Sequence, residues 1–125
     1  MTDSAAVGRW IDAYLAAWDS NEPDDIRRLF RPDGAYRFHP WDEPVVGHEA
    51  IEAAWLNSRD EPGDHGFTWR LIAVDGETAV VQGRTAYTAG EAAGRVYENL
   101  WVLQLAPDGR ATSFTEWYME RPAGG

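Results

Sequence analysis

The apolar positions in the first half of the chain recur with the period of helices. Residues 7–18 place an apolar side chain at every third or fourth position, and Asp3 or Ser4 could cap this helix. A short second helix should begin near Pro23, because proline suits the first position of a helix, and it should turn Ile26, Leu29 and Phe30 inward. Gly47 then precedes a third apolar stripe of helical spacing. The pattern therefore predicts three N-terminal helices.

From residue 67 onward, apolar and polar positions alternate, as in strands with one buried face. A polar loop at 58–66 precedes this part, and a short strand at 35–39 follows a break at Pro32-Asp33-Gly34. Turn signals separate four predicted antiparallel strands, which are 67–74, 77–88, 97–105 and 111–119. We therefore expect one α+β domain over residues 1–125, with three helices packed on a strongly curved, mainly antiparallel sheet.

The turns predict which side chains share the inner face of this sheet. A two-residue turn at Asp108-Gly109 should place Trp101 opposite Glu116 and Asn99 opposite Tyr118. A turn at Asp75-Gly76 and a loop at 89–94 should add Gln82 and Arg84 from the second strand. The expected face is an aromatic bowl with one acid, one cation and two amides: Phe67, Trp69, Leu71, Val80, Gln82, Arg84, Tyr97, Asn99, Trp101, Leu103, Phe114, Glu116 and Tyr118.

The opposite face of the predicted sheet is too apolar to face water. Its large side chains would be Ile72, Val81, Tyr87, Leu100, Val102, Trp117 and Met119, with polar residues such as Thr85 between them. A surface of this kind favours contact with a second copy of the chain about a two-fold axis. We therefore expect a homodimer that forms through Val81, Leu100, Val102 and Trp117.

Composition limits the partners of the chain. Its 125 residues carry a formal net charge of −10, which nucleic acid or an anionic membrane surface would repel. No apolar run reaches the roughly 20 residues of a membrane span, and no signal peptide is recognisable. Cysteine is absent, which excludes disulfides and thiolate catalysis and favours a cytoplasmic location. Seven tryptophans exceed the need of a small core, so some should line a cavity or an interface.

Four motifs extend over nearly the whole chain: Tyr14-Leu15-Ala16-Ala17-Trp18, Leu29-Phe30 with Asp33-Gly34-Ala35-Tyr36, Gly47-His48-Glu49-Ala50-Ile51, and Asp108-Gly109-Arg110 before Phe114-Thr115-Glu116-Trp117. Together they resemble the SnoaL-like branch of the nuclear transport factor 2-like superfamily, which includes ketosteroid isomerases, limonene epoxide hydrolases, scytalone dehydratases and polyketide cyclases. The resemblance implies a cystatin-like α+β barrel with a cone-shaped pocket. It implies little about chemistry, because such folds support many reactions.

Position by position, the resemblance to the isomerases is partial. Tyr14 lies where they have a tyrosine that donates to the substrate oxyanion, and His39 lies one residue from their catalytic aspartate. Trp101 replaces their second, protonated aspartate. Steroid isomerisation by that mechanism is therefore not expected. The Arg-Asp-Asp set of the epoxide hydrolases is also missing, although Arg84 and Glu116 could supply a similar cation and acid.

Each candidate residue has a chemical and a structural interpretation. Glu116 could be a general base whose pKa is raised by burial, or it could form a structural ion pair with Arg84. His39 could transfer protons near neutral pH or simply lie at the pocket rim. Tyr14 could donate to a ligand or belong to the core. The candidate ligand-binding residues are Asn99, Trp101, Gln82, Trp69, Tyr97, Tyr118, Phe114, Trp18 and Trp55.

We interpret the chain as a cofactor-independent acid–base enzyme of the isomerase, cyclase or dehydratase/hydratase type. Its substrate would be a small, mostly apolar carbonyl or polyketide-like compound. The alternative is a non-catalytic small-molecule-binding or dimerisation module of the same fold, and an open cavity beside Glu116 would favour the enzyme. No metal site is expected, because the three histidines lie in different elements without ligand spacing. The charges at 59–61 and at 24–25 are expected to be solvated.

Overall fold

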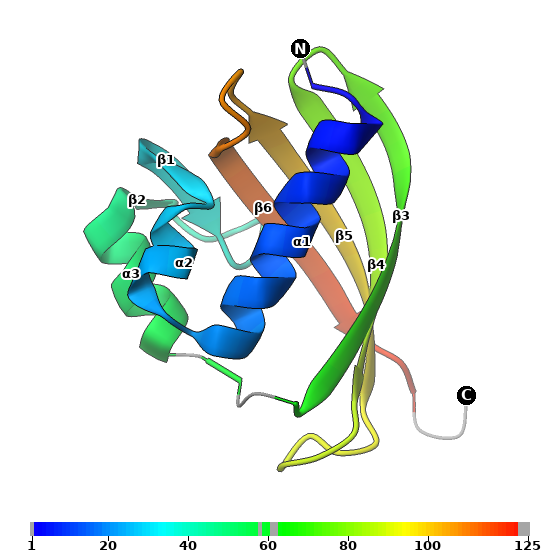
Figure 1. The fold of residues 1–125 in the computed structure, drawn as a ribbon. Helices are drawn as coiled ribbons and strands as arrows, with labels where there is room; N and C mark the ends of the chain where they lie inside the picture. Colours follow the sequence, from blue (N-terminus) through cyan, green and yellow to red (C-terminus); the bar gives the residue numbers. More distant parts are fainter. Residues whose placement is uncertain (1, 58, 61–62, 123–125) are drawn as a thin grey trace.

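The computed structural model describes residues 2–57, 59–60 and 63–122. In these residues, three helices pack against the concave side of a curved six-stranded sheet (Figure 1). The predicted α+β fold class is confirmed. Residues 58, 61 and 62 of the predicted 58–66 loop lie outside the described residues. Among the helices of the described residues, none combines the length and the hydropathy that a membrane span requires.

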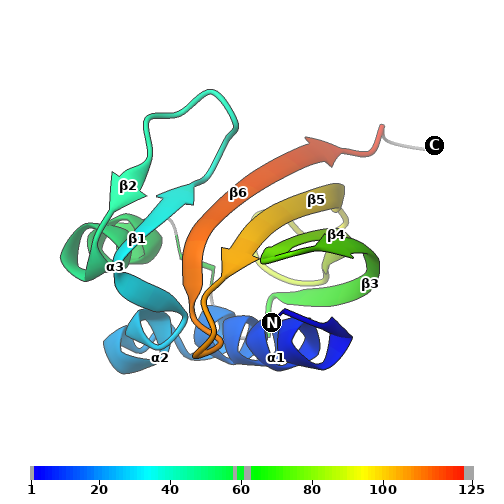
Figure 2. The same ribbon diagram turned by 90° about the horizontal axis from the view of Figure 1, so that it is seen from above.

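The first and third helices occupy the predicted positions, whereas the second begins at Pro23 as predicted but ends at Arg27, so that Leu29 and Phe30 lie beyond it. The first, α1 (Ser4–Ser20), is capped by Asp3, whose side chain accepts a hydrogen bond of 2.8 Å from the backbone nitrogen of Ala6. The second and third are α2 (Pro23–Arg27) and α3 (His48–Asn57). Helix α1 crosses the concave face of the sheet, while α2 and α3 lie beside its first strands (Figures 1 and 2). The helices bury the predicted stripe residues Val7, Trp10, Ile11, Tyr14, Ile26, Ile51 and Trp55.

The sheet has the strand order β2-β1-β6-β5-β4-β3. Its strands are β1 (Phe30–Arg37), β2 (Val45–Val46), β3 (His65–Asp75), β4 (Thr78–Tyr87), β5 (Val96–Leu105) and β6 (Ala111–Glu120). Strand β1 runs parallel to β6, and the other neighbours are antiparallel. Figure 2 shows how the long strands curl over α1.

Strand β1 differs from the prediction in its bounds. It begins at Phe30 and ends at Arg37, whereas the predicted strand covered 35–39. The expected break at 32–34 lies within β1, where the pairing with β6 shifts register. A Cβ at Gly34 would lie 3.1 Å from the backbone oxygens of Arg31 and Ala111, so this irregular segment passes close to its neighbours. The two-residue strand β2 was not predicted.

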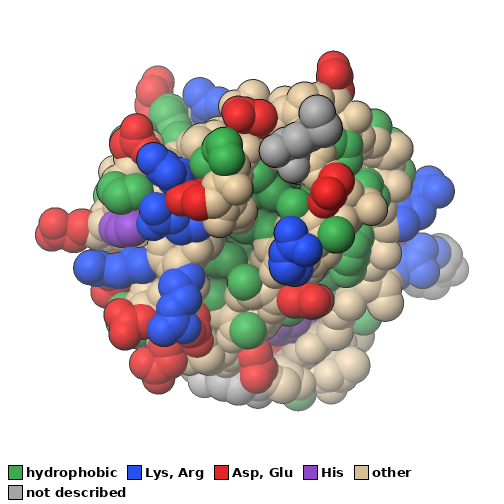
Figure 3. All heavy atoms as spheres, turned by 45° about the horizontal axis from the view of Figure 1, so that its top comes forward, with side chains coloured by type: hydrophobic (Ala, Val, Ile, Leu, Met, Phe, Trp, Pro, Cys, Tyr) green, Lys and Arg blue, Asp and Glu red, His purple; other side chains and the backbone are tan. Residues whose placement is uncertain are grey.

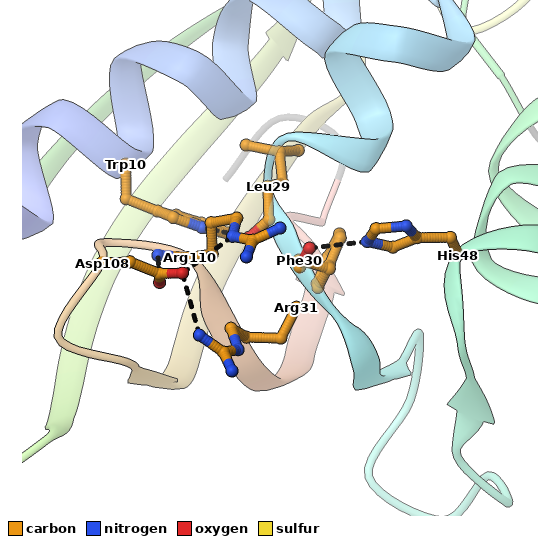
Figure 4. Close-up of polar contacts among 7 residues, drawn as sticks. All are labelled: Trp10, Leu29, Phe30, Arg31, His48, Asp108 and Arg110. Atoms are coloured by element: carbon orange, nitrogen blue, oxygen red, sulfur yellow. Dashed lines mark hydrogen bonds and ion pairs between the residues drawn. The ribbon is translucent and has the colours of Figure 1, made fainter.

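Polar contacts connect the turn between β5 and β6 to β1 (Figure 4). Asp108 accepts hydrogen bonds from Arg31 at 2.9 Å and from Arg110 at 3.0 Å. Nearby, Trp10 Nε1 donates to the carbonyl oxygen of Leu29 at 2.9 Å.

On the face drawn in Figure 3, basic and acidic side chains lie intermixed rather than in separate patches.

The register of the last hairpin is confirmed, whereas that of β4 is wrong by one residue. Trp101 lies opposite Glu116 as predicted. The turn between β3 and β4 comes one position later than predicted, since Asp75 pairs with Thr78, and a bulge between Leu71 and Ala73 corrects only part of this displacement. A net shift of one residue turns every side chain of β4 to the other face.

The shift changes the composition of the inner face. Ala79, Val81, Gly83 and Thr85 are buried beneath the helices, whereas Gln82 and Arg84 are exposed on the outer face. The predictions that placed Val80, Gln82 and Arg84 inside, and Val81, Thr85 and Tyr87 outside, are therefore wrong. Packing explains why residue 83 is a glycine, because the ring of Phe67 occupies the space that a Cβ would need. Phe67 in turn stacks on Trp101, with ring centroids 4.7 Å apart.

Candidate active site

A cavity of about 290 Å³ opens between α1, α3 and the concave face of the sheet. Among the described residues, fourteen line the cavity, of which nine are aromatic and two are acids. They come from all parts of the chain: Tyr14, Trp18, Tyr36, Phe38, Trp55, Arg59, Asp60, Thr85, Tyr87, Tyr97, Asn99, Trp101, Glu116 and Tyr118. A concave, mostly apolar space with a few converging polar groups is typical of a small-molecule site.

Glu116 is held by a chain of hydrogen bonds across three strands. Its Oε2 accepts from Asn99 Nδ2 at 2.7 Å and from Trp101 Nε1 at 3.0 Å. Thr85 Oγ1 donates to Asn99 Oδ1 at 2.8 Å, which fixes the amide so that its nitrogen faces Glu116. Oε1 accepts no hydrogen bond from any residue that the structure describes. One carboxylate oxygen is thus anchored, and the other is available to a ligand.

The environment of Glu116 favours its protonated form. Burial raises the pKa of this carboxyl above its ordinary value, although the hydrogen bonds from Trp101 and Asn99 oppose the shift. The expected ion pair with Arg84 does not exist. Arg84 Nε lies 3.0 Å from Glu98 Oε2 on the outer face of the sheet. Within the described residues, no arginine is at ion-pair distance from Glu116. The one-residue shift of β4 is the reason, and Arg84 is not near the cavity.

Two buried phenols lie on another wall of the cavity. The hydroxyl oxygens of Tyr14 and Tyr36 are 3.1 Å apart. Burial is the largest cause that raises the pKa of both phenols, and the charge of Glu116 adds to it. Both therefore stay protonated and can donate a hydrogen bond. Tyr36 was not predicted as a site residue, although it belongs to a motif of the family resemblance.

Asp60 is a second cavity acid that the sequence interpretation missed. Its Oδ2 accepts hydrogen bonds from Trp18 Nε1 at 2.8 Å and from the Tyr87 hydroxyl at 2.9 Å. The prediction that this residue is solvated is wrong, because the loop after α3 turns it towards the cavity. Burial, followed by the nearby charge of Asp60, raises the pKa of the Tyr87 phenol. No periodicity could have indicated this placement, since Asp60 lies in a loop.

His39 lies at the rim of the cavity, as one of its two interpretations expected. Its ring nitrogens contact Asp42 Oδ2 at 2.9 Å and the Tyr118 hydroxyl at 2.8 Å. Its indole neighbour, Trp41, stacks on the imidazole with ring centroids 5.0 Å apart. His39 therefore reaches the cavity through Tyr118.

The cavity brings together eight of the thirteen candidate residues: Tyr14, Trp18, Trp55, Tyr97, Asn99, Trp101, Glu116 and Tyr118. Gln82 and Arg84 lie on the outer face and are corrections to the prediction. Trp69 and Phe114 face inward but pack in the core instead of lining the cavity. Thr85 and Tyr87 were missed because β4 was placed in the wrong register. In the part of the chain that the structure describes, no group of three or more His, Asp or Glu side chains could hold a metal ion.

Two of the solved structures that match show the same fold. One is an NTF-2-like protein of unknown function from Burkholderia xenovorans LB400, with a TM-score of 0.68 and 16% identity over 95% of this chain and 89% of that one. The other is an LEH-like epoxide hydrolase from M. tuberculosis, with a TM-score of 0.63 and 17% identity over 89% and 80% of the two chains. At these identities the likeness extends to the fold alone.

No curated protein matches the chain at a significant level. The SnoaL-like domain family, in contrast, matches residues 11–119, which is most of the sequence. This match agrees with the resemblance carried by the four motifs and with the observed helices and curved sheet. The chain therefore belongs to the family of SnoaL-like domains.

Proposed function

We propose that this protein is a cofactor-independent acid–base enzyme that acts on a small, mostly apolar carbonyl compound. The observation that carries the proposal is the open cavity beside Glu116, whose carboxyl has a raised pKa and one unanchored oxygen. A buried carboxyl with these properties suits proton transfer. A merely structural acid would need its buried charge compensated by a partner, and Arg84 does not supply that partner.

The first step would transfer a proton from carbon to Glu116. Oε1 would take the proton from a carbon next to the carbonyl group, and the electron pair of that C–H bond would form an enolate. Tyr14, supported by Tyr36, would donate a hydrogen bond to the enolate oxygen. Glu116 would then return the proton to another atom. Isomerases, cyclases and dehydratases of this type share the first step, so the proposal covers all three.

Exchange of carbon-bound protons in deuterated water tests this step without knowledge of the natural substrate. We would incubate the protein with apolar aromatic ketones such as 2-tetralone and follow deuterium incorporation by NMR. The wild type should accelerate exchange, and Glu116→Gln should abolish the acceleration. Arg84→Ala, on the outer face, is the matched control and should keep the full rate. Full activity of Glu116→Gln would contradict the proposal.

A non-catalytic binding module remains the alternative, and the aromatic lining of the cavity favours it as much as it favours an enzyme. The version of this alternative with a closed Arg84–Glu116 pair is contradicted by the structure. The remaining version predicts that aromatic compounds bind without any exchange. Tight binding of ketones that the wild type never deuterates would support the module.

We also propose that the outer face of the sheet joins two copies of the chain. Four large apolar side chains are exposed on it, namely Ile72, Leu100, Trp117 and Met119. Val102 contributes as well, whereas Val81 does not, because it is fully buried on the inner face. Burying these side chains against each other would remove apolar area from water.

A further inference from the structure

A series of three hydrogen-bonded ionisable groups lies at the rim of the cavity. It is separate from the residues that donate hydrogen bonds to Glu116. Asp42 Oδ2 is 2.9 Å from His39 Nδ1, and His39 Nε2 is 2.8 Å from the hydroxyl oxygen of Tyr118. Tyr118 also lines the cavity, and it follows Glu116 by two positions on the same face of β6. The series therefore connects solvent at Asp42 to the cavity beside Glu116.

The chemistry of the three groups determines which atom donates. An ionised carboxylate can only accept hydrogen bonds, so the contact with Asp42 places a proton on His39 Nδ1. In a neutral imidazole the other nitrogen then has no proton and can only accept. The Tyr118 hydroxyl must therefore donate to Nε2. Its hydrogen is engaged by His39, and its oxygen lone pairs are left for a ligand.

Protonation of His39 reverses this arrangement. Both ring nitrogens of an imidazolium donate, so Nε2 donates to the Tyr118 oxygen. The phenolic hydrogen is then free to turn towards the cavity. The charge of His39 thus decides whether Tyr118 offers a ligand a hydrogen-bond acceptor or a donor.

The surroundings hold this series in place. The backbone nitrogen of Asp42 donates to the carbonyl of His39 at 3.1 Å, and Trp41 covers one side of the imidazole. Charged and titratable groups face His39 from three sides. They are Asp42 on its own loop, Glu116 and Tyr118 on β6, and Arg37 at the end of β1, whose Nε donates to the backbone oxygen of Asp42 at 3.2 Å.

We propose that Asp42, His39 and Tyr118 form a second acid–base unit of the site, in which Tyr118 contacts the ligand and the other two position it. The inference rests on the proposed function, and it selects elimination or addition of water from the possible reactions. In the elimination, Glu116 takes the C–H proton, the electron pair forms the C=C bond, and the C–O bond breaks. The departing hydroxide receives the proton of Tyr118, which the imidazolium form of His39 replaces from its Nε2. Substrate becomes alkene and water, Glu116 gains one proton, and His39 loses one.

The tautomer of His39 tests the unit directly. Long-range ¹H–¹⁵N NMR of labelled protein at about pH 8 should show His39 with its proton on Nδ1, the less common form of free imidazole. Glu116→Gln should leave this tautomer unchanged, since it lies outside the series. Asp42→Asn should produce a mixture, because an amide no longer requires a proton on Nδ1. A proton on Nε2 in the wild type would overturn the proposal.

The effect on a ligand can be measured with two probes that differ in whether their oxygen carries a hydrogen. The hydroxyl of 2-naphthol can donate or accept a hydrogen bond, whereas the ether oxygen of 2-methoxynaphthalene can only accept one. In the Glu116→Gln background, quenching of tryptophan fluorescence should show 2-methoxynaphthalene binding strengthen about fivefold between about pH 8 and pH 5, because protonation of His39 makes Tyr118 a donor. Binding of 2-naphthol should change less, because its hydroxyl can pair with Tyr118 in both states.

The variant Tyr118→Phe separates this unit from other titrating groups. It should remove the pH dependence of 2-methoxynaphthalene binding while keeping the binding of both probes. An unchanged pH dependence in this variant, or the absence of binding by both probes, would overturn the role of Tyr118. Failure of the proposed function would be visible separately, because ketone exchange depends on Glu116 and both experiments here work without its carboxyl.

Discussion

The substitution Glu116→Gln tests whether the buried charge of Glu116 lowers the stability of the folded protein. Glutamine has nearly the same shape, and its amide oxygen can accept the hydrogen bonds that Asn99 and Trp101 now donate to Oε2. The substitution therefore removes a negative charge while it preserves the contacts. Since burial raises the pKa of Glu116 in the folded protein, ionisation is harder there than in the unfolded chain.

The sign of the effect on stability follows from this difference. Below the unfolded-state pKa, Glu116 is protonated in both states, and its favourable contribution to folding is fully present. This contribution is lost as the pH rises through the folded-state pKa, because the unfolded chain then ionises more readily. Each unit of upward shift corresponds to about 1.4 kcal/mol in the free energy of unfolding. At neutral pH, Glu116→Gln should therefore be at least as stable as the wild type.

Urea denaturation at a series of values between about pH 4 and pH 8 measures this difference. The stability of the variant relative to the wild type should increase with pH and become constant above the folded-state pKa of Glu116. A loss of about 3–5 kcal/mol at every pH would refute the reasoning, because that is the cost of breaking a buried ion pair. Glu98→Gln is the control. It breaks the exposed pair with Arg84 and should cost less than about 1 kcal/mol.

Three further substitutions test the packing, the anchoring and the outer face. Gly83→Ala should lower stability by about 1–3 kcal/mol in thermal unfolding, because its Cβ would displace the ring of Phe67; an unchanged melting temperature would contradict the β4 register. Thr85→Val leaves Asn99 Oδ1 without its donor and should cost about 1–3 kcal/mol in urea denaturation, whereas a smaller loss would mean that another group satisfies the amide. Leu100→Glu should convert a dimer to monomers in sedimentation velocity, and a monomeric wild type would refute the proposed dimer.

Much of the architecture could be predicted from local patterns. The helical spacing and the cap at Asp3 identify α1 because both depend on neighbours within a few residues. The same is true of the pairing between Trp101 and Glu116, since one short turn connects the two strands. These local signals were enough to place a buried acid on the wall of an aromatic cavity, before any tertiary contact was known.

The remaining parts of the site depend on contacts that are distant in sequence. The bulge after Leu71, the later turn and the pairing of Gly83 with Asn99 decide the phase of β4, so that Thr85 rather than Arg84 reaches the side chain of Asn99. The Phe67 ring can pack over β4 only where residue 83 is a glycine that faces inward, so this contact fixes the register of β4. The contact could not be predicted from local sequence, because Phe67 lies on another strand. Asp60 depends in the same way on Trp18 and Tyr87. Interactions between neighbouring residues are enough to specify the long helices, the long strands and the last hairpin. The polar groups that meet Glu116 depend instead on packing across the sheet, because this packing governs a one-residue shift in strand pairing.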